Sequence, residues 1–183
     1  QGGTSTLTFS IDSSTALIDV PALDFTNNLP AGVTVAPTPN ASTTGTSGTL
    51  SAAAGAGTLS YTGGTVSAGV TCTVQLDVTS ATAGAAVNTS GDLTSSQGNS
   101  GTASDTLTVN AAPAPTFAMS VSPTTIAQGD VTSVRFTVDN AAALISADTL
   151  GFDLLLPAGV GFAAPMNFSS DCVGGAATPI AGG

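Results

Sequence analysis

The stretch TCTVQLDV at residues 71–78 alternates polar and apolar side chains without a break. In an extended chain its apolar side chains share one face and its polar side chains the other, because successive residues of a strand point to opposite faces. The segments TLTFSID at 6–12 and TLTV at 106–109 show the same alternation. All three segments therefore predict β-strands with one buried face.

Weaker strand patterns lie between clusters of Gly, Pro and Asn, residues that favour turns. They are ALDFTN (22–27), VTVA (33–36), GTLS (48–51), TLSY (58–61) and AAVNTS (85–90). Thr and Val, which favour strands, recur throughout, whereas Glu and Lys, which favour helices, are absent. Short strands with one apolar face each predict an all-β fold of antiparallel β-sandwiches of immunoglobulin-like type.

The chain also repeats itself. The pentapeptide LPAGV at residues 29–33 returns at 156–160, 127 positions later. At this shift 20 of the 56 overlapping positions are identical without a gap, including the triplet ALI at 16–18 and 143–145. A match of this length indicates an internal duplication. LPAGV itself predicts a turn between strands, because Pro presets φ and Gly is free to adopt positive φ.

The duplication predicts two units in tandem. Residues 1–109 form a first immunoglobulin-like unit that lacks its first strand. Residues 110–115, NAAPAP, form a short Pro-containing linker. Residues 116–183 form the opening portion of a second unit, which is incomplete within this chain. The strand-like segment TFAMSVSP at 116–123 precedes the region that matches the beginning of the first unit.

The charge of the chain restricts its partners. All eleven acidic residues are Asp, Arg135 is the only base, and the net charge is −10. Nucleic-acid binding requires Lys and Arg at phosphates, so the composition argues against it and against docking on anionic membranes. No apolar run reaches the roughly 18–20 residues of a membrane helix, so we expect no membrane insertion. Without His, Glu and Lys no acid–base pair can be assembled, and we expect no enzymatic activity.

Several segments have a familiar order and spacing. They include FTNNLPAGVTV (25–35), GTLSYTGGTVSAGVTCTV (57–74) and FAMSVSPTTIAQGDVTSVRFTVDN (117–140). These segments resemble the Ig-like conserved repeats of large secreted bacterial surface proteins, a family of mostly unknown function. The resemblance implies tandem β-sandwiches in an extracellular or cell-surface location, and it carries no catalytic residues.

The two cysteines depart from the pattern of that family. Similar units hold one cysteine in a loop and one in a strand, but Gly45 occupies the loop position of the first unit. Cys72 is the strand cysteine of the first unit, and Cys172 is the loop cysteine of the second. Three arrangements remain open: both thiols unpaired, a disulfide to a partner chain or to further sequence, or a direct bond between the two. A catalytic thiol would need a base, and a zinc site would need more nitrogen or sulfur ligands.

Carboxylates and glycosylation sequons provide the other candidate sites. Calcium chooses carboxylate oxygens, so acidic residues in corresponding stretches of the two units are weak calcium candidates, the alternative being solvated loop carboxylates. These candidates are Asp12, Asp19, Asp24, Asp139, Asp148 and Asp153. We expect no other cofactor. Candidate glycosylation sites are Asn40, Asn88 and Asn167, each of which begins an N-x-S/T sequon.

A sandwich that lacks its first strand exposes a sheet edge. The apolar residues Phe117, Met119 and Val121 alternate along a candidate assembly strand. We therefore expect neighbouring copies or continuing chain to complete each sandwich by donor-strand complementation. The predicted function is a structural building block of an extracellular filament or cell-surface stalk. The alternative is an adhesin or carbohydrate-binding surface module, for which the chain offers no Trp and only Tyr61.

Overall fold

The computed structural model describes residues 1–172 and residue 176, and this part of the chain contains β-strands but no helix. The strands are β1 (Thr4–Asp12), β2 (Val20–Asn28), β3 (Val33–Val35), β4 (Ser42–Thr44), β5 (Thr46–Ser51), β6 (Thr58–Val66), β7 (Thr71–Ser80), β8 (Gly84–Thr89), β9 (Thr94–Ser95), β10 (Gly98–Asn99), β11 (Ser104–Val109), β12 (Thr116–Ser122) and β13 (Ser133–Asp139). Every strand pairing is antiparallel. The predicted all-β fold is therefore confirmed.

Residue contacts divide the chain into two compact units. The first consists of Gln1–Ala114 together with Ala141–Ser146, and the second of Pro115–Asn140 together with the residues from Ala147 onward. The expected linker, residues 110–115, lies outside the strands, between β11 and β12.

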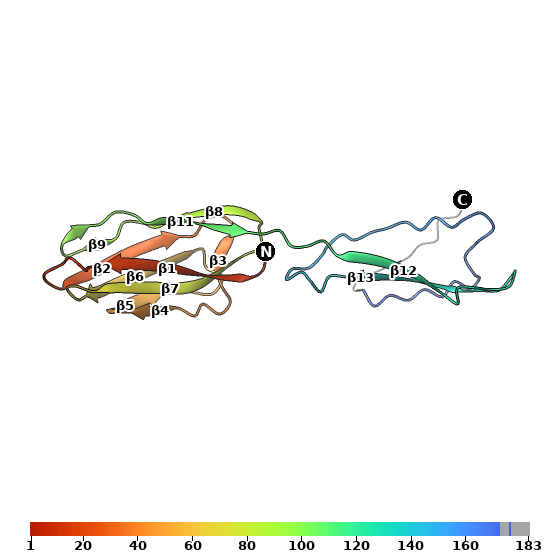
Figure 1. Cartoon of the computed structure of the whole chain (residues 1–183), viewed down its shortest axis with the longest axis horizontal. Coiled ribbons are helices and arrows are strands. Elements are labelled where there is room, and N and C mark those ends of the chain that lie inside the picture. Colours follow the sequence, from red (N-terminus) through yellow and green to blue (C-terminus); the bar gives the residue numbers. More distant parts are fainter. Residues whose placement is uncertain (173–175, 177–183) are drawn as a thin grey trace. The chain divides into compact units, whose positions relative to one another are not determined.

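The first unit is built from two main sheets (Figure 1). One has the order β1-β7-β3, and β4 also pairs with β7. The other has the order β10-β9-β2-β6-β5. A separate pair, β8 with β11, completes the unit. This arrangement leaves β1 at the end of its sheet.

Strand β7, which contains the alternating residues 71–78, lies at the centre of the core. Its four apolar residues, Cys72, Val74, Leu76 and Val78, are all buried on the inner face of β7. Across the ladder, Leu7, Phe9 and Ile11 of β1 lie opposite Leu76, Val74 and Cys72. Directly opposite residues of an antiparallel pair share a face, so both strands turn the same side to the core.

Aromatic rings join the two sheets. The rings of Phe9 and Phe25 lie 4.8 Å apart between centroids, and those of Phe25 and Tyr61 lie 5.7 Å apart. Tyr61 is fully buried, and its hydroxyl donates a hydrogen bond of 2.6 Å to the carbonyl of Ser47. Burial raises the pKa of this phenol. A side chain at Gly64 would collide with the Tyr61 ring, so the glycine is required by the close approach of backbone and ring.

LPAGV forms a turn in both units, as predicted. The N–H of Val33 donates to the carbonyl of Pro30 at 3.0 Å, and Gly32 has a φ of 83°. In the second unit the N–H of Val160 donates to the carbonyl of Pro157 at 3.1 Å, and Gly159 also has a φ of 83°. Only Gly adopts this conformation without steric cost, which explains the shared sequence.

Three strands of the first unit have no clear signal in the sequence. They are β4, β9 and β10, each only two or three residues long. Strands β9 and β10 occupy a Ser-, Gly- and Asn-rich stretch without alternation. They pair with each other, and β9 also pairs with β2. Tertiary contact rather than local propensity therefore decides these strands.

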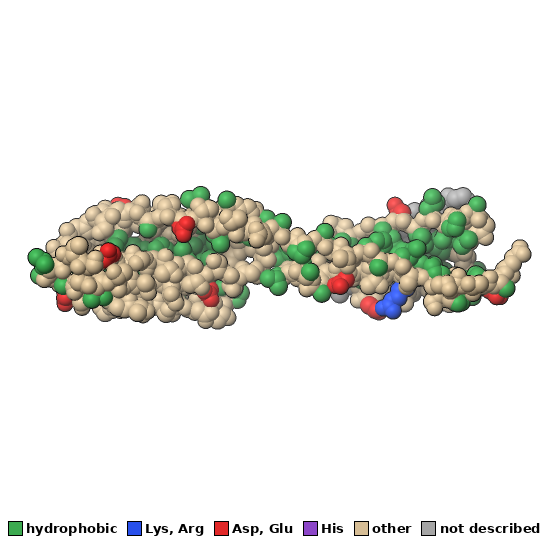
Figure 2. Space-filling view, in the orientation of Figure 1, with side chains coloured by type: hydrophobic (Ala, Val, Ile, Leu, Met, Phe, Trp, Pro, Cys, Tyr) green, Lys and Arg blue, Asp and Glu red, His purple; other side chains and the backbone are tan. Residues whose placement is uncertain are grey.

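The second unit contains one ladder among its described residues, between β12 and β13. Its apolar residues share one face, because Phe117 lies opposite Val138, Met119 opposite Phe136 and Val121 opposite Val134. A cluster of three rings, which we call the second-unit aromatic cluster, consists of Phe117, Phe136 and Phe152. Apolar side chains accordingly gather on the visible surface of this unit (Figure 2).

Candidate functional site

The edge of β1 is the most distinctive feature of the first unit. All nine residues of β1 pair with β7, from Thr4 opposite Thr79 to Asp12 opposite Thr71. On its other side β1 pairs with no strand of the described residues. A strand in this position presents unpaired backbone N–H and C=O groups, which are a template for a further strand.

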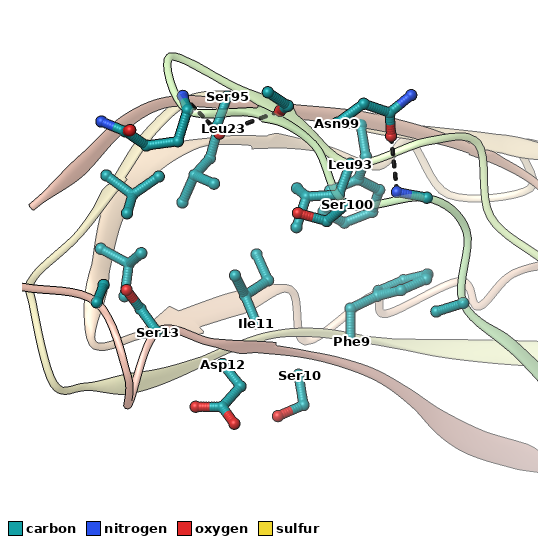
Figure 3. A pocket seen from close by; sticks show the side chains of 18 of the residues that line it. Phe9, Ser10, Ile11, Asp12, Ser13, Leu23, Leu93, Ser95, Asn99 and Ser100 are labelled. Atoms are coloured by element: carbon teal, nitrogen blue, oxygen red, sulfur yellow. Dashed lines mark hydrogen bonds between the residues drawn. The ribbon is translucent and has the colours of Figure 1, made fainter.

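A groove runs beside this edge, between the two sheets. Its volume is about 440 Å³. Its apolar lining combines Phe9 and Ile11 of β1 with Leu23 and Phe25 of β2 and with Leu93. Figure 3 shows Phe9 and Ile11 directed into the space from one side and Leu23 and Leu93 from the other. In the space-filling view, apolar side chains are visible within a hollow of this unit (Figure 2).

A second, smaller cavity of about 110 Å³ lies beside the N-terminal half of β1. Leu7 of β1 contributes to it, together with Leu29, Val33 and Leu107. Both cavities are therefore lined by the core face of the same edge strand. We call the two together the β1 groove.

The far rim of the groove is a hydrogen-bonded loop, residues 93–103. The N–H of Leu93 donates to the carbonyl of Gly101 at 2.9 Å, and the N–H of Ser100 donates to the carbonyl of Leu93 at 2.8 Å. The side-chain oxygen of Asn99 accepts from the N–H of Gly101 at 2.6 Å. These contacts fix the loop as a wall that does not close over the groove.

Ser13, which follows β1, marks one end of the groove. Its side chain is buried at 7% exposure, yet its hydroxyl has no hydrogen-bond partner among the described residues. Buried hydroxyl groups are nearly always paired, since leaving one unpaired costs about 1–3 kcal/mol. This hydroxyl is an unpaired, buried polar group at that end of the groove.

The second unit contains the same strand with a partner. The 127-residue repeat makes β13 the counterpart of residues 6–12 of β1. In the first unit one side of this strand is taken by β7. In the second unit β12 pairs with it over seven residues, Thr116–Ser122.

The predicted calcium candidates do not come together. Among residues 1–172 and 176, no three acidic or cysteine side chains are placed to hold a metal ion. The first-unit carboxylates instead cap loops: Asp12, Asp19 and Asp24 accept hydrogen bonds from the N–H groups of Ser14, Ala68 and Gly63. The bond from Ser14, with a further one from Thr71, lowers the pKa of Asp12. In the second unit Asp148 and Asp153 lie on segments outside the strands, and Asp139 ends β13.

The cysteines have different environments, and both thiols are free. Cys72 is buried in the core, and burial raises its pKa, so it is a poor nucleophile. Cys172 is exposed. A β-carbon built on Gly45 would lie 3.3 Å from that of Cys72, close to the separation of about 3.5–4.5 Å in a disulfide. The loop cysteine implied by the family resemblance would thus lie beside Cys72.

The three sequons also differ in environment. Asn40 and Asn167 are exposed, and Asn40 donates a hydrogen bond of 2.7 Å to Asp77. Asn88 is buried and forms two reciprocal amide bonds with Asn27, of 3.0 and 3.1 Å. A glycan on Asn88 would break this pair, so the geometry disfavours the predicted site at Asn88 and leaves the other two accessible.

Comparison with known proteins identifies the family of both units. The model of a domain of unknown function, DUF7933, matches residues 1–109 and again residues 115–183. The chain belongs to the DUF7933 family. The second DUF7933 match includes β12, so this strand is part of the domain. No curated protein and no solved structure matches the chain.

In the described part of this DUF7933 chain, no helix is long and apolar enough to cross a membrane. The sequence predicted the apolar face of β1 and the strand β12, but not the opposite wall of the groove. Leu93 lies in a polar stretch without alternation, and Ser13 is one serine among many. Only the three-dimensional pairing of the strands brings these residues to the edge of β1.

Proposed function

We propose that this DUF7933 protein is a structural building block of an extracellular filament or cell-surface stalk, made of β-sandwich units that are completed by strand addition. The observation that carries the proposal is the β1 groove. It is a space lined in part by apolar core residues, beside an edge strand whose repeated counterpart, β13, has a partner.

Strand addition suits the geometry of this groove. An added strand gains main-chain hydrogen bonds along the edge, and alternate side chains of that strand fill pockets between the sheets. The edge offers nine residues, and the pockets lie on its core face beside Leu7, Phe9 and Ile11. The volume of about 440 Å³ exceeds the roughly 150 Å³ of an enclosed cavity that admits benzene, so the larger pocket has room for a ring and a neighbouring side chain.

Composition and family resemblance support a location outside the cell. The chain carries a net charge of −10 with a single basic residue, Arg135, which favours solubility and disfavours nucleic-acid partners. The order of its motifs resembles the immunoglobulin-like repeats of secreted bacterial surface proteins. We propose that each unit has an immunoglobulin-like sandwich as its completed form.

The alternative function, an adhesin or carbohydrate-binding module, gains no support from the first unit, whose aromatic residues Phe9, Phe25 and Tyr61 are all buried. Sugar-binding platforms need exposed aromatic rings, and Tyr61 is fully buried in the core of the first unit. The outward face of β1 carries Thr4, Thr6, Thr8, Ser10 and Asp12, none of which is aromatic. We therefore propose an architectural role without enzymatic activity.

Two measurements test this function. Antibodies against the folded chain are expected to label the surface of unpermeabilised cells of the source organism. Electron microscopy of the native material is expected to show filaments or stalks with a regular repeat along their length. Exclusively intracellular labelling, or native material composed of isolated globular particles, would contradict the proposal.

A further inference from the structure

We infer that a buried pair of asparagines, Asn27 of β2 and Asn88 of β8, sets the register of β8 in the first unit. The pair selects which face of β8 turns toward the core, against the register that the apolar residues of this strand favour by themselves. Such a device acts in the interior of one unit and does not depend on what occupies the β1 groove.

The two side chains satisfy each other. The amide nitrogen of Asn27 donates to the side-chain oxygen of Asn88 at 3.0 Å, and the amide nitrogen of Asn88 donates to the side-chain oxygen of Asn27 at 3.1 Å. Asn27 is fully buried, and Asn88 is 8% exposed. A buried amide that loses its partner does not regain its contact with water, so each asparagine holds the other in place.

Asn27 interrupts the apolar face of β2. Leu23, Phe25 and Asn27 alternate along this strand, and all three are buried. Across the ladder to β6, Asn27 lies opposite Leu59, which is also buried. An apolar side chain is the ordinary choice for such a position. The amide of Asn27 is accommodated there through its hydrogen bonds with Asn88.

Strand β8 turns a polar residue inward and its largest apolar residue outward. In the ladder with β11, Ala86 lies opposite Leu107, and both pack against the core. Val87, the next residue, is 60% exposed, and Asn88 after it is buried. Successive residues of a strand point to opposite faces, so Ala86 and Asn88 share the core side and Val87 takes the other side.

A slip of one residue would exchange the two faces of β8. Val87 would then turn toward the core and Asn88 would turn toward water, which is the arrangement that the hydrophobic pattern alone favours. The slip would also leave Asn27 buried without its partner. The amide pair therefore opposes the slip, because Val87 cannot be buried without the loss of both amide hydrogen bonds.

The pair lies where the chain passes from one sheet to another. Strand β8 pairs with β11 up to Thr89, and Ser90 then forms a bridge with Asn27. The N–H of Gly91 donates to the carbonyl of Thr26 at 2.8 Å. These backbone contacts are the alternative source of the register, and they do not involve the side chains of the two asparagines.

The duplication indicates that a leucine fits at the position of Asn27. At the 127-residue shift this position is occupied by Leu154. The polar residue is therefore not a requirement of the repeat itself. Strands with a weak apolar pattern are prone to slip and to form alternate pairings, so a unit whose β8 contains Gly, Ala and a single Val gains from a polar pair that selects one register.

Disulfide trapping across the ladder between β8 and β11 measures the register. Thr89 and Ser104 lie directly opposite each other, both exposed, and their hydroxyl oxygens are 3.0 Å apart. The full chain is prepared with Thr89→Cys, Ser104→Cys and Cys172→Ser, and the disulfide formed under mild oxidation is quantified by mass spectrometry. In the observed register the two β-carbons lie about 4.5–5.5 Å apart, whereas a slip of one residue turns position 89 to the other face.

Two double variants of this chain remove the amide pair without leaving an amide unpaired. Asn27→Leu with Asn88→Leu places an apolar residue at position 88, so we expect the observed register and a disulfide yield equal to that of the chain with both asparagines. Asn27→Leu with Asn88→Thr leaves position 88 polar, so we expect Val87 to turn inward and the yield to fall at least ten-fold. Adding Val87→Thr to the second variant removes the reason for the slip and should restore at least half of the yield.

An undiminished yield from the variant with Thr at position 88 would overturn the inference, because the backbone contacts of Ser90 and Gly91 would then set the register. A low yield from the variant with Leu at position 88, or no recovery on adding Val87→Thr, would overturn it as well. Urea unfolding followed by Tyr61 fluorescence checks that each variant is folded. Loss of the cooperative transition in either double variant would mean that the amides maintain the fold instead of its register, which also contradicts the inference.

Discussion

Strands β1 and β13 occupy equivalent positions of a duplicated unit, 127 residues apart, but their surroundings differ. β1 pairs with β7 and packs Phe9 against Phe25 in the buried core, with its outer edge open. β13 pairs with β12, and its ring cluster stays half exposed. Among the described residues, β1 thus has β7 as its partner and β13 has β12. The same sequence pattern forms a strand beside either partner, while the neighbouring strands decide how much of it is buried.

The chain provides a separate probe for each unit. Tyr61 is the only tyrosine and the chain has no Trp, so tyrosine fluorescence reports on the first unit. Arg135 is the only site for trypsin, and it lies in β13, so cleavage reports on the second unit. Both probes work in the unmodified protein, at concentrations low enough to keep it monomeric.

The largest expected effect comes from removing equivalent rings. Phe25→Ala deletes a buried ring between Phe9 and Tyr61, so we expect it to lower the free energy of unfolding of the first unit by about 3–5 kcal/mol. Phe152→Ala removes a ring that is 53% exposed and should cost about 1–2 kcal/mol, in the second unit only. Urea unfolding followed by Tyr61 fluorescence measures the first effect. If Phe152→Ala shifted the unfolding transition reported by Tyr61, the two units would not unfold independently, which would contradict this prediction.

The second effect concerns the position that is Gly45 in one unit and Cys172 in the other. We expect Gly45→Cys to form a disulfide with Cys72, whose β-carbon is adjacent. Closing a loop of this length stabilises by about 3–4 kcal/mol, and the left-handed φ of 74° at this position offsets about 1–2 kcal/mol. The net gain of about 2 kcal/mol is measured by urea unfolding with and without reductant. Gly45→Ser, which has the strain but no bond, should be destabilised, and a reductant-insensitive Gly45→Cys would contradict this prediction.

A smaller effect tests the ladder between β12 and β13. Phe117→Ser removes contacts to Phe136 and Phe152, which we expect to weaken the pairing by about 1.4 kcal/mol. Cleavage by trypsin then follows the population of the open ladder, so cutting at Arg135 should become about ten-fold faster. Ala118→Ser changes the outward face of the same strand and should leave the rate unaltered. Equal rates for both variants would mean that the aromatic cluster does not stabilise the second unit.

The smallest expected effect is a pH dependence of the stability of the first unit, caused by the carboxylate of Asp77. Hydrogen bonds from Asn40 and Thr6 hold the pKa of Asp77 below its ordinary value of 3.8. The carboxylate therefore stabilises the first unit at pH values above 3.8, and this contribution is lost as the pH falls through the lower pKa of the folded state. We expect Asp77→Asn to destabilise slightly at pH 6 and to converge with the wild type near pH 2, in thermal melts followed by Tyr61. A difference that grows on acidification would contradict this assignment.

The strands with strong alternation were predictable because their signal is local. Residues 6–12, 71–78 and 106–109 each present one apolar face whatever surrounds them, and each is a strand in the structure. The LPAGV turns were predictable for the same reason, since Pro and Gly determine the backbone at their own positions. The strand predicted within residues 116–123 is likewise present in the structure, as β12.

Features that depend on distant neighbours were not predictable. Asn88 has the sequence of a glycosylation site, but its amide is buried against Asn27, 61 residues away in the chain. Leu93 lines the groove only because β9 pairs with β2 and positions the following loop. No local sequence pattern predicts that Gly64 leaves space for the ring of Tyr61.

The sequence by itself determined the all-β class, the turns and the duplication, because alternation, turn residues and repetition are properties of the chain order alone. It also determined the equivalence of β1 and β13. Only the tertiary structure decided that β1 lies at the end of its sheet, beside a groove. The physical reason is that an edge is defined by which strands pair and which do not, and pairing is a property of the folded sheet as a whole.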